Sequence, residues 1–253
     1  MDGFSAFRNE IGTFREIVLK KDDGCGRMEV KDLKIQPSQR GVTMLLLTSN
    51  GLSSQALLNC VQSDMNNGKS AVIITTASAP FKKNDKHIPR LTAELESIGC
   101  SVDFFDFDED APKELLQYDL VEIIGGNPFY LLRSIRHAGT ELILKQLAKE
   151  KILIGISAGS VVLQNSIRLI AGYSPEMNEG IGLADMTGVG VANLEILPHY
   201  HRFIERFDRF EERAKEYETA NHCAVIRIDD GQGVLMRDDG YEIIGKEDHS
   251  ETV

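Results

Sequence analysis

Residues 152–165 read ILIGISAGSVVLQN, and this stretch decides the fold of the chain. An apolar run of strand length at 152–157 leads through a glycine-rich turn directly into a helix expected over 157–165. A strand that passes straight into a helix is the repeating unit of α/β proteins with parallel sheets. The run has no polar alternation, which is typical of a strand covered by helices on both faces.

The same alternation of strands and helices continues on the N-terminal side of this unit. Strands are expected at 42–48, 70–77, 100–107 and 119–126. Helices are expected at 52–68, 87–99, 128–139 and 140–151. Short β-like runs at 224–228, 233–237 and 241–245 are separated by Asp-Asp-Gly turns, which predicts a C-terminal β-meander. The fold class expected is therefore α/β, with a mostly parallel sheet, helices on both faces and a terminal meander.

The composition excludes several classes of function. Of the 253 residues, 42% are hydrophobic and 26% are charged, which is ordinary for a globular domain. The net charge of −11 argues against a partner that is nucleic acid or an anionic membrane, because phosphate binding needs clustered Lys and Arg. No apolar run approaches the roughly 18 residues of a membrane span. The N-terminus lacks the pattern of a secretion signal, so a cytoplasmic location is expected.

The cysteines and the first 40 residues are the remaining compositional signals. The four cysteines are scattered without a Cys-x-x-Cys pair, so free thiols are expected instead of disulfides or a zinc site. Residues 1–40 carry eight basic and seven acidic residues, whereas the rest of the chain holds the excess of acid. We therefore expect an N-terminal extension of unknown role at 1–40 and an α/β domain at 41–253.

Ser157 is the candidate nucleophile. It is the central residue of Gly155-Ile156-Ser157-Ala158-Gly159, a G-x-S-x-G pattern between the predicted strand and helix. In such a turn the serine hydroxyl is exposed at the edge of the sheet, and small neighbours are needed because the backbone segments approach closely. The same glycine-rich pattern also occurs where a helix merely packs closely on a sheet.

A nucleophilic serine needs a base, and the base needs an acid that orients it. His199 is the candidate base because it directly follows the apolar run LEILP at 194–198. His201 is its rival, and the His-x-His spacing also resembles a metal pair, but no third ligand group accompanies it and no metal is expected. The acid stays open among the carboxylates between serine and histidine, which are Glu176, Glu179, Asp185 and Glu195.

Three segments taken together resemble a known family. They are IIGGNPFYLL at 123–132, GISAGS at 155–160 and LPHY at 197–200. In this order and spacing they are similar to the peptidase E family of serine peptidases, which includes aspartyl dipeptidases and, more distantly, cyanophycinases. The runs LLLTSNG at 45–51 and VIITTAS at 72–78 fit the first two strands of that family. The resemblance spans roughly residues 41–245.

The resemblance implies a flavodoxin-like sheet related to the class I glutamine amidotransferases. It implies Ser157 as nucleophile and His199 as general base. The family acid is expected 15 to 20 residues after the serine, which selects Glu176, with Glu179 as the second choice.

The resemblance also implies the remainder of the site. The backbone amides of Gly126 and Ala158 would hold the oxyanion, Asn127 would border the substrate, and no cofactor is needed. The expected function is a serine peptidase that cleaves dipeptides with an N-terminal aspartate. The alternatives are an isoaspartyl or cyanophycin-type peptidase on the same scaffold, or a catalytically silent binding protein. The expected partner is a small peptide, and assembly into a homodimer is left open.

The segment after His199 carries a repeated arginine. Arg202, Arg206, Arg209 and Arg213 recur at helical spacing, opposite an apolar stripe that includes Phe203 and Phe207. One interpretation is that an early member, Arg206, binds a substrate carboxylate. The other interpretation is an ordinary solvated face that pairs with neighbouring glutamates.

Overall fold

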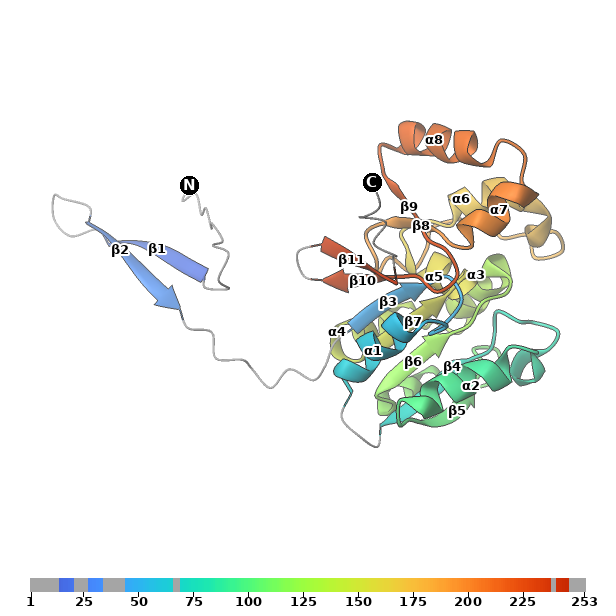
Figure 1. The fold of residues 1–253 in the computed structure, drawn as a ribbon, viewed down its shortest axis with the longest axis horizontal. Helices are drawn as coiled ribbons and strands as arrows, with labels where there is room; N and C mark the ends of the chain where they lie inside the picture. Colours follow the sequence, from blue (N-terminus) through green and yellow to red (C-terminus); the bar gives the residue numbers. More distant parts are fainter. Residues whose placement is uncertain (1–13, 21–26, 34–43, 66–68, 238–239, 246–253) are drawn as a thin grey trace, which may run out of the picture. The chain divides into compact units, whose positions relative to one another are not determined.

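The computed structural model describes residues 14–20, 27–33, 44–65, 69–237 and 240–245 (Figure 1). The chain divides into two units, residues 1–40 and residues 41–253. In the first unit, β1 (Phe14–Lys20) and β2 (Arg27–Leu33) form an antiparallel pair in which Phe14 lies opposite Leu33. None of the helices in the described ranges is long and apolar enough to cross a membrane.

A seven-stranded sheet in the order β11-β10-β3-β7-β6-β4-β5 forms the centre of the second unit. Its strands are β3 (Met44–Thr48), β4 (Ser70–Ile74), β5 (Ser101–Phe105), β6 (Leu120–Ile123), β7 (Ile152–Ile156), β10 (Gly233–Arg237) and β11 (Gly240–Ile244). The five strands from β3 to β5 are parallel to one another, and β10 is antiparallel to both β3 and β11. The predicted mostly parallel, flavodoxin-like α/β sheet is therefore confirmed.

Helices cover the two faces of this sheet (Figure 1). The α-helices are α1 (Gln55–Ser63), α2 (Ile88–Ser97), α3 (Pro128–His137), α4 (Glu141–Glu150), α5 (Ala158–Leu163), α6 (Arg168–Tyr173), α7 (Tyr200–Arg206) and α8 (Phe210–Asn221). The 3-10 helices are η1 (Lys82–Asn84), η2 (Pro112–Gln117) and η3 (Pro175–Asn178). The packing contacts place α5 against β7 and β3, and α2 against β5. Each predicted strand and helix from 42 to 165 thus has its counterpart, shortened by a few residues at its ends.

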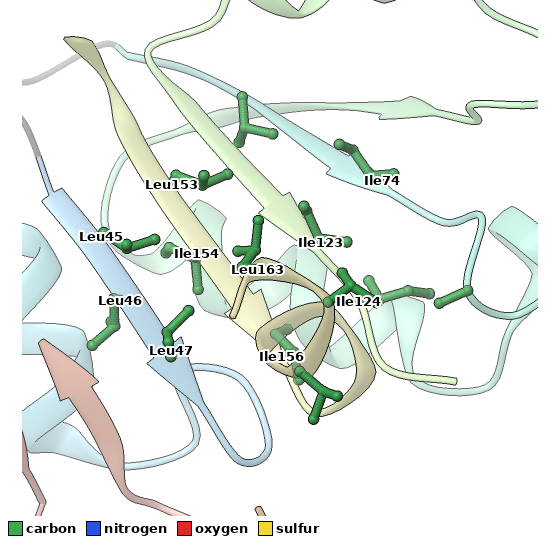
Figure 2. Packing of buried hydrophobic residues seen from close by; sticks show 14 of the residues in the cluster. Leu45, Leu46, Leu47, Ile74, Ile123, Ile124, Leu153, Ile154, Ile156 and Leu163 are labelled. Atoms are coloured by element: carbon green, nitrogen blue, oxygen red, sulfur yellow. The ribbon is translucent and has the colours of Figure 1, made fainter. Parts of the chain in front are cut away.

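The core lies between the sheet and these helices. Figure 2 shows side chains from β3, β6 and β7 packed around Leu163 of α5. Leu46, Leu47 and Ile154 are completely buried, although neighbouring residues of a strand point to opposite faces. Burial on both faces is the physical reason for the unbroken apolar runs in the sequence.

Glu122 is the exception in this core. It lies in β6, is completely buried, and neither of its carboxyl oxygens has a hydrogen-bond partner among the described residues. Burial raises the pKa of this carboxyl to about 8. Glu122 is therefore protonated at neutral pH, because the ionised form would lose its hydration without compensation.

Gly159 sets how closely α5 approaches the sheet. A methyl group at this position would overlap the backbone carbonyl of Ile123 in β6. The substitution Gly159→Ala is expected to lower the free energy of unfolding by about 1–3 kcal/mol, because the helix must move away from the strand. Gly172→Ala is the matched control, since nothing lies within 4 Å of its added methyl group. Urea unfolding of both variants measures the difference, and equal stability of Gly159→Ala and wild type would contradict this packing.

The prediction of a three-stranded C-terminal meander is wrong for the first of its strands. Only β10 and β11 form a hairpin, which extends the central sheet beside β3. The run at 224–228 contains β9 (Val225–Arg227), which pairs in parallel with β8 (Glu195–Leu197) in a separate two-stranded sheet. A turn sequence shows where the chain reverses, but it does not show which strand has a free edge for pairing. The sequence pattern therefore favoured pairing between strands that follow one another in the chain.

The arginine-rich segment is also two helices instead of one. The chain is extended at Phe207 and left-handed at Arg209, with φ of 49°, so α7 ends before α8 begins. The four arginines therefore do not share one continuous helical stripe.

Candidate active site

Ser157 lies in the turn between β7 and α5. Its backbone has φ of 49° and ψ of −108°, a strained conformation for a residue with a side chain. The backbone amide of Ser157 donates a hydrogen bond to the carbonyl of Thr48 at 3.0 Å, which holds the turn in place at the end of β3. This geometry matches the predicted elbow, in which the serine side chain projects from the carboxyl edge of the sheet.

His199 lies two residues after β8 and is 8% exposed. Its backbone is left-handed, with φ of 58° and ψ of 37°. The imidazole Nε2 lies 2.9 Å from the hydroxyl oxygen of Ser157, although 42 residues separate the two. The structure thus brings the predicted nucleophile and the predicted base into hydrogen-bonding contact.

Asp230 lies on the other side of the imidazole. Its Oδ1 is 2.6 Å from Nδ1 of His199. The two residues meet because β8 and β9 are parallel, so the segments that follow them leave at the same edge. Pairing continues beyond the strands, where the amide of Ile228 donates to the carbonyl of Leu197 at 3.1 Å.

The protonation of this pair follows from its contacts. Burial raises the pKa of Asp230, but hydrogen bonds from Ser49 and His199 outweigh burial and bring that pKa below its ordinary value. An ionised carboxylate only accepts hydrogen bonds, so Nδ1 of His199 carries the proton. Nε2 is then free to accept the proton of Ser157. Burial lowers the pKa of His199 despite the opposing effect of Asp230, so the imidazole is neutral at neutral pH.

The expectation that Glu176 contacts the imidazole requires correction. Glu176 lies in η3 and Glu179 directly follows it, and both side chains are exposed. The carboxylate that the structure places against His199 is Asp230. Asp230 lies after His199 in the chain, whereas the acid was expected between Ser157 and His199. The available signal was the Asp-Asp-Gly turn at the carboxyl end of a predicted strand, which is where side chains of α/β sites gather.

Two cavities meet at Ser157. One of about 400 Å³ has a largely apolar wall that includes Val161, Ile170, Met177 and Phe203. The other, of about 260 Å³, has a polar wall that includes Asn50, Asp85, Lys86, His87 and Arg90. Gly126, Ser157, His199 and Arg202 line both cavities. A substrate that spans the two cavities passes over the serine hydroxyl.

The predicted oxyanion residues border the same space. Gly126 has φ of 144°, and a methyl group there would overlap the carbonyl of Ala77, so a side chain is excluded. Ala158 lines the larger cavity and is the first residue of α5. Amides in the first turn of a helix have no partner within the helix and remain able to bind a ligand.

Asn127 occupies a structural position. Its Oδ1 accepts hydrogen bonds from the amides of Phe129 and Tyr130 and caps α3, while its Nδ2 donates to the carbonyl of Met177 at 2.7 Å. Asn127 is not among the residues that line either cavity. Asn127 therefore connects α3 to η3, and its place beside the substrate stays a prediction.

The arginines separate into two groups. Arg206 lines the larger cavity, and its guanidinium lies 5.1 Å from the centre of the Phe207 ring. Arg202 lines both cavities, although the sequence pattern favoured Arg206 as the arginine that binds a carboxylate. Arg209 instead pairs with Glu216 at 2.6 Å and lines neither cavity.

His201, the rival base, is directed elsewhere. Its side chain is 80% exposed, and both its Nδ1 and its backbone amide bond to the carboxylate of Asp229. The structure therefore separates the two histidines of the His-x-His pattern, and only His199 contacts Ser157.

The fold and the site define the class of protein. The sheet is flavodoxin-like, a strained serine follows its central strand β7, and this serine is hydrogen-bonded to a histidine whose other ring nitrogen contacts an aspartate. This is the architecture of α/β hydrolytic enzymes. A family model described as peptidase family S51 matches residues 45–244, and the chain belongs to this family. It is therefore a peptidase, and the predicted resemblance to peptidase E is confirmed.

Relatives are similar to this chain in sequence, and solved structures are similar to it in fold. An uncharacterized peptidase of Listeria monocytogenes is 27% identical over 209 residues, which cover 80% of this chain and 97% of the relative. An uncharacterized peptidase of Pasteurella multocida is 29% identical over 134 residues, covering 52% of this chain and 62% of that protein. A candidate peptidase E protein from Listeria monocytogenes has a TM-score of 0.62 at 22% identity, covering 79% of this chain and 97% of its own. A peptidase from an acI-B1 Actinobacterium has the same TM-score at 21% identity, covering 82% and 89%.

Proposed function

We propose that the protein is a serine peptidase that hydrolyses short peptides through a triad of Ser157, His199 and Asp230. The observation that carries the proposal is the unbroken hydrogen-bonded chain, 2.9 Å from the serine oxygen to Nε2 and 2.6 Å from Nδ1 to the carboxylate. Both distances lie within the reach needed for proton transfer and for orientation of the imidazole.

In the proposed mechanism the hydroxyl oxygen of Ser157 attacks the peptide carbonyl while Nε2 of His199 takes its proton. The negative oxygen that forms is held by the backbone amides of Gly126 and Ala158. The imidazolium then gives its proton to the leaving amine, and the acyl-enzyme remains. A water molecule, deprotonated by His199, attacks the ester and restores Ser157. Asp230 holds Nδ1 throughout and stabilises the positive imidazolium.

For the substrate we propose dipeptides whose N-terminal residue is aspartate. Two observations support an acidic substrate, namely the resemblance to the aspartyl dipeptidases and the guanidinium groups of Arg202 and Arg206 on the walls of the cavities. The overall charge of −11 would repel an acidic peptide, so local arginines are needed to bind it.

The test is hydrolysis of Asp-Leu, isoAsp-Leu and Ala-Leu by wild type and by Arg206→Met. Wild type is expected to prefer Asp-Leu, and Arg206→Met to lower kcat/KM for Asp-Leu about 10–100-fold with little change for Ala-Leu, the loss expected for one hydrogen bond to a charged group. Methionine removes the guanidinium but keeps an unbranched side chain at this position. Arg209→Met is the control, because Arg209 pairs with Glu216 outside both cavities. A wild type that prefers isoAsp-Leu selects the isoaspartyl alternative, and one that cleaves none of the three refutes the dipeptidase proposal.

A further inference from the structure

Ser49 contacts both partners of the candidate base and acid. It follows the last residue of β3 and is completely buried. Its hydroxyl donates to Oδ1 of Asp230 at 2.7 Å and accepts from the backbone amide of His199 at 2.9 Å. The same oxygen lies 3.0 Å from Nδ1 of His199. One hydroxyl therefore contacts the backbone of the histidine, its ring and the carboxylate.

The preceding residue, Thr48, contacts the candidate nucleophile. Its carbonyl accepts hydrogen bonds from the amide of Ser157 at 3.0 Å and from the hydroxyl of Ser160 at 2.8 Å. Its own hydroxyl donates to the carbonyl of Gly155 at 3.1 Å. Two consecutive residues at the carboxyl end of β3 thus hold the serine on one side and the histidine–aspartate pair on the other.

This position matters because the three reacting residues come from two separate sheets. Ser157 follows β7 in the central sheet, whereas His199 and Asp230 follow β8 and β9, which pair only with each other. A sheet of two three-residue strands has little rigidity of its own. The loop of Asp230 is joined to the central sheet by the amide of Ser49, which donates to the carbonyl of Gln232 at 3.2 Å.

The loop that carries Ser49 is itself firmly held. The guanidinium of Arg90 donates to the carbonyl and to the side-chain oxygen of Asn50 at 3.1 and 3.0 Å. Glu94 pairs with Arg90 and accepts from the amide of Leu52 at 2.9 Å. Residues of α2 therefore hold the loop of Ser49 in a fixed position. A residue that orients another group must itself be held in this way.

We propose that Ser49 is a positioning residue for the triad, which sets the orientation of His199 and of Asp230 through its single hydroxyl. The inference rests on the proposed function, because orientation of the imidazole matters only if His199 acts as the base. Without the hydroxyl, the backbone of His199 loses a support for its left-handed conformation. Asp230, whose side chain is 44% exposed, loses one of its hydrogen-bond donors and keeps its contact with Nδ1 of His199.

The test is Ser49→Ala. Because Asp230 would lose one of its two side-chain hydrogen-bond donors, its negative charge would be less stabilised, should attract the imidazolium more strongly and should raise the pKa of His199. The acid limb of the pH profile of kcat/KM is expected to move to higher pH. For Asp-Leu, kcat is expected to fall about 10–100-fold, the effect of one hydrogen bond to a charged group, while KM changes little.

Ser54→Ala is the matched control. The hydroxyl of Ser54 also joins this loop to the Asp230 loop, by donating to the carbonyl of Gly231 at 2.7 Å, but it touches neither His199 nor Asp230. A merely structural role predicts equal effects of the two substitutions. Urea unfolding of both variants shows whether either loss of activity follows from loss of folded protein.

The pKa of His199 is measured independently of activity, by NMR titration of its ring Hε1 signal, assigned by its loss in His199→Gln. A raised pKa in Ser49→Ala together with an unchanged pKa in Ser54→Ala supports the proposal. An unchanged or lowered pKa in Ser49→Ala overturns it, even if the wild type is an active peptidase. If the wild type neither cleaves peptides nor reacts with a small fluorophosphonate, the proposed function fails and the role of Ser49 in catalysis fails with it. The titration then still reports whether the hydrogen bonds of Ser49 control the imidazole.

Discussion

Asp230→Asn is expected to lower kcat about 10⁴-fold, with little change in the fold or in KM. The amide group has nearly the same shape as the carboxylate, but its NH₂ end is a donor. An asparagine that turns this end toward Nδ1 favours the histidine tautomer with its proton on Nε2, which cannot accept the proton of Ser157. The positive charge that forms on the imidazole would also lose its counter-charge. Steady-state hydrolysis of Asp-Leu measures this loss.

Glu176→Gln is the control that separates the two candidate acids. Glu176 is exposed in η3, so its neutralisation is expected to change kcat less than about twofold, the usual range for a surface substitution away from a site. A large loss in Glu176→Gln combined with a small loss in Asp230→Asn would restore the assignment made from the sequence. It would also mean that η3 moves onto the imidazole during the reaction.

Ser157→Ala is expected to abolish turnover, with a loss of about 10⁴–10⁶-fold in kcat, because no other hydroxyl occupies the position from which the acyl-enzyme forms. Substrate binding should persist, since the walls of both cavities are unchanged. The second readout is covalent labelling by a small fluorophosphonate followed by mass spectrometry. One adduct is expected in the wild type, located on Ser157, and none in the variant.

Ser160→Ala provides the comparison for this labelling experiment. Ser160 lies three residues further along the chain, in α5, but its hydroxyl is buried and donates to the carbonyl of Thr48. This variant is expected to keep the adduct on Ser157. Full labelling and turnover in Ser157→Ala would be incompatible with the proposed mechanism and would transfer the chemistry to another residue.

The local features of the chain were readable from the sequence. The run at 152–165 predicted the strand, the serine turn and the helix, because these depend on neighbouring residues and on the burial of both strand faces. The order of the motifs around Gly126, Ser157 and His199 also pointed to the family. The structure brings Ser157 and His199 into contact, because Ser157 directly follows β7, His199 lies two residues after β8, and the carboxyl ends of both strands lie at the site.

Only the tertiary structure shows which carboxylate contacts His199 and which residues line the two cavities. Asp230 reaches His199 only because β9 leaves the neighbouring hairpin and pairs in parallel with β8, a choice set by which strand edges are free in the assembled fold. In the same way, the break between α7 and α8 leaves Arg206 on the larger cavity and Arg209 outside it. Sequence patterns show which residues of a strand or helix are buried and where the chain turns. Contacts between distant segments depend on strand pairing, which short-range patterns do not encode.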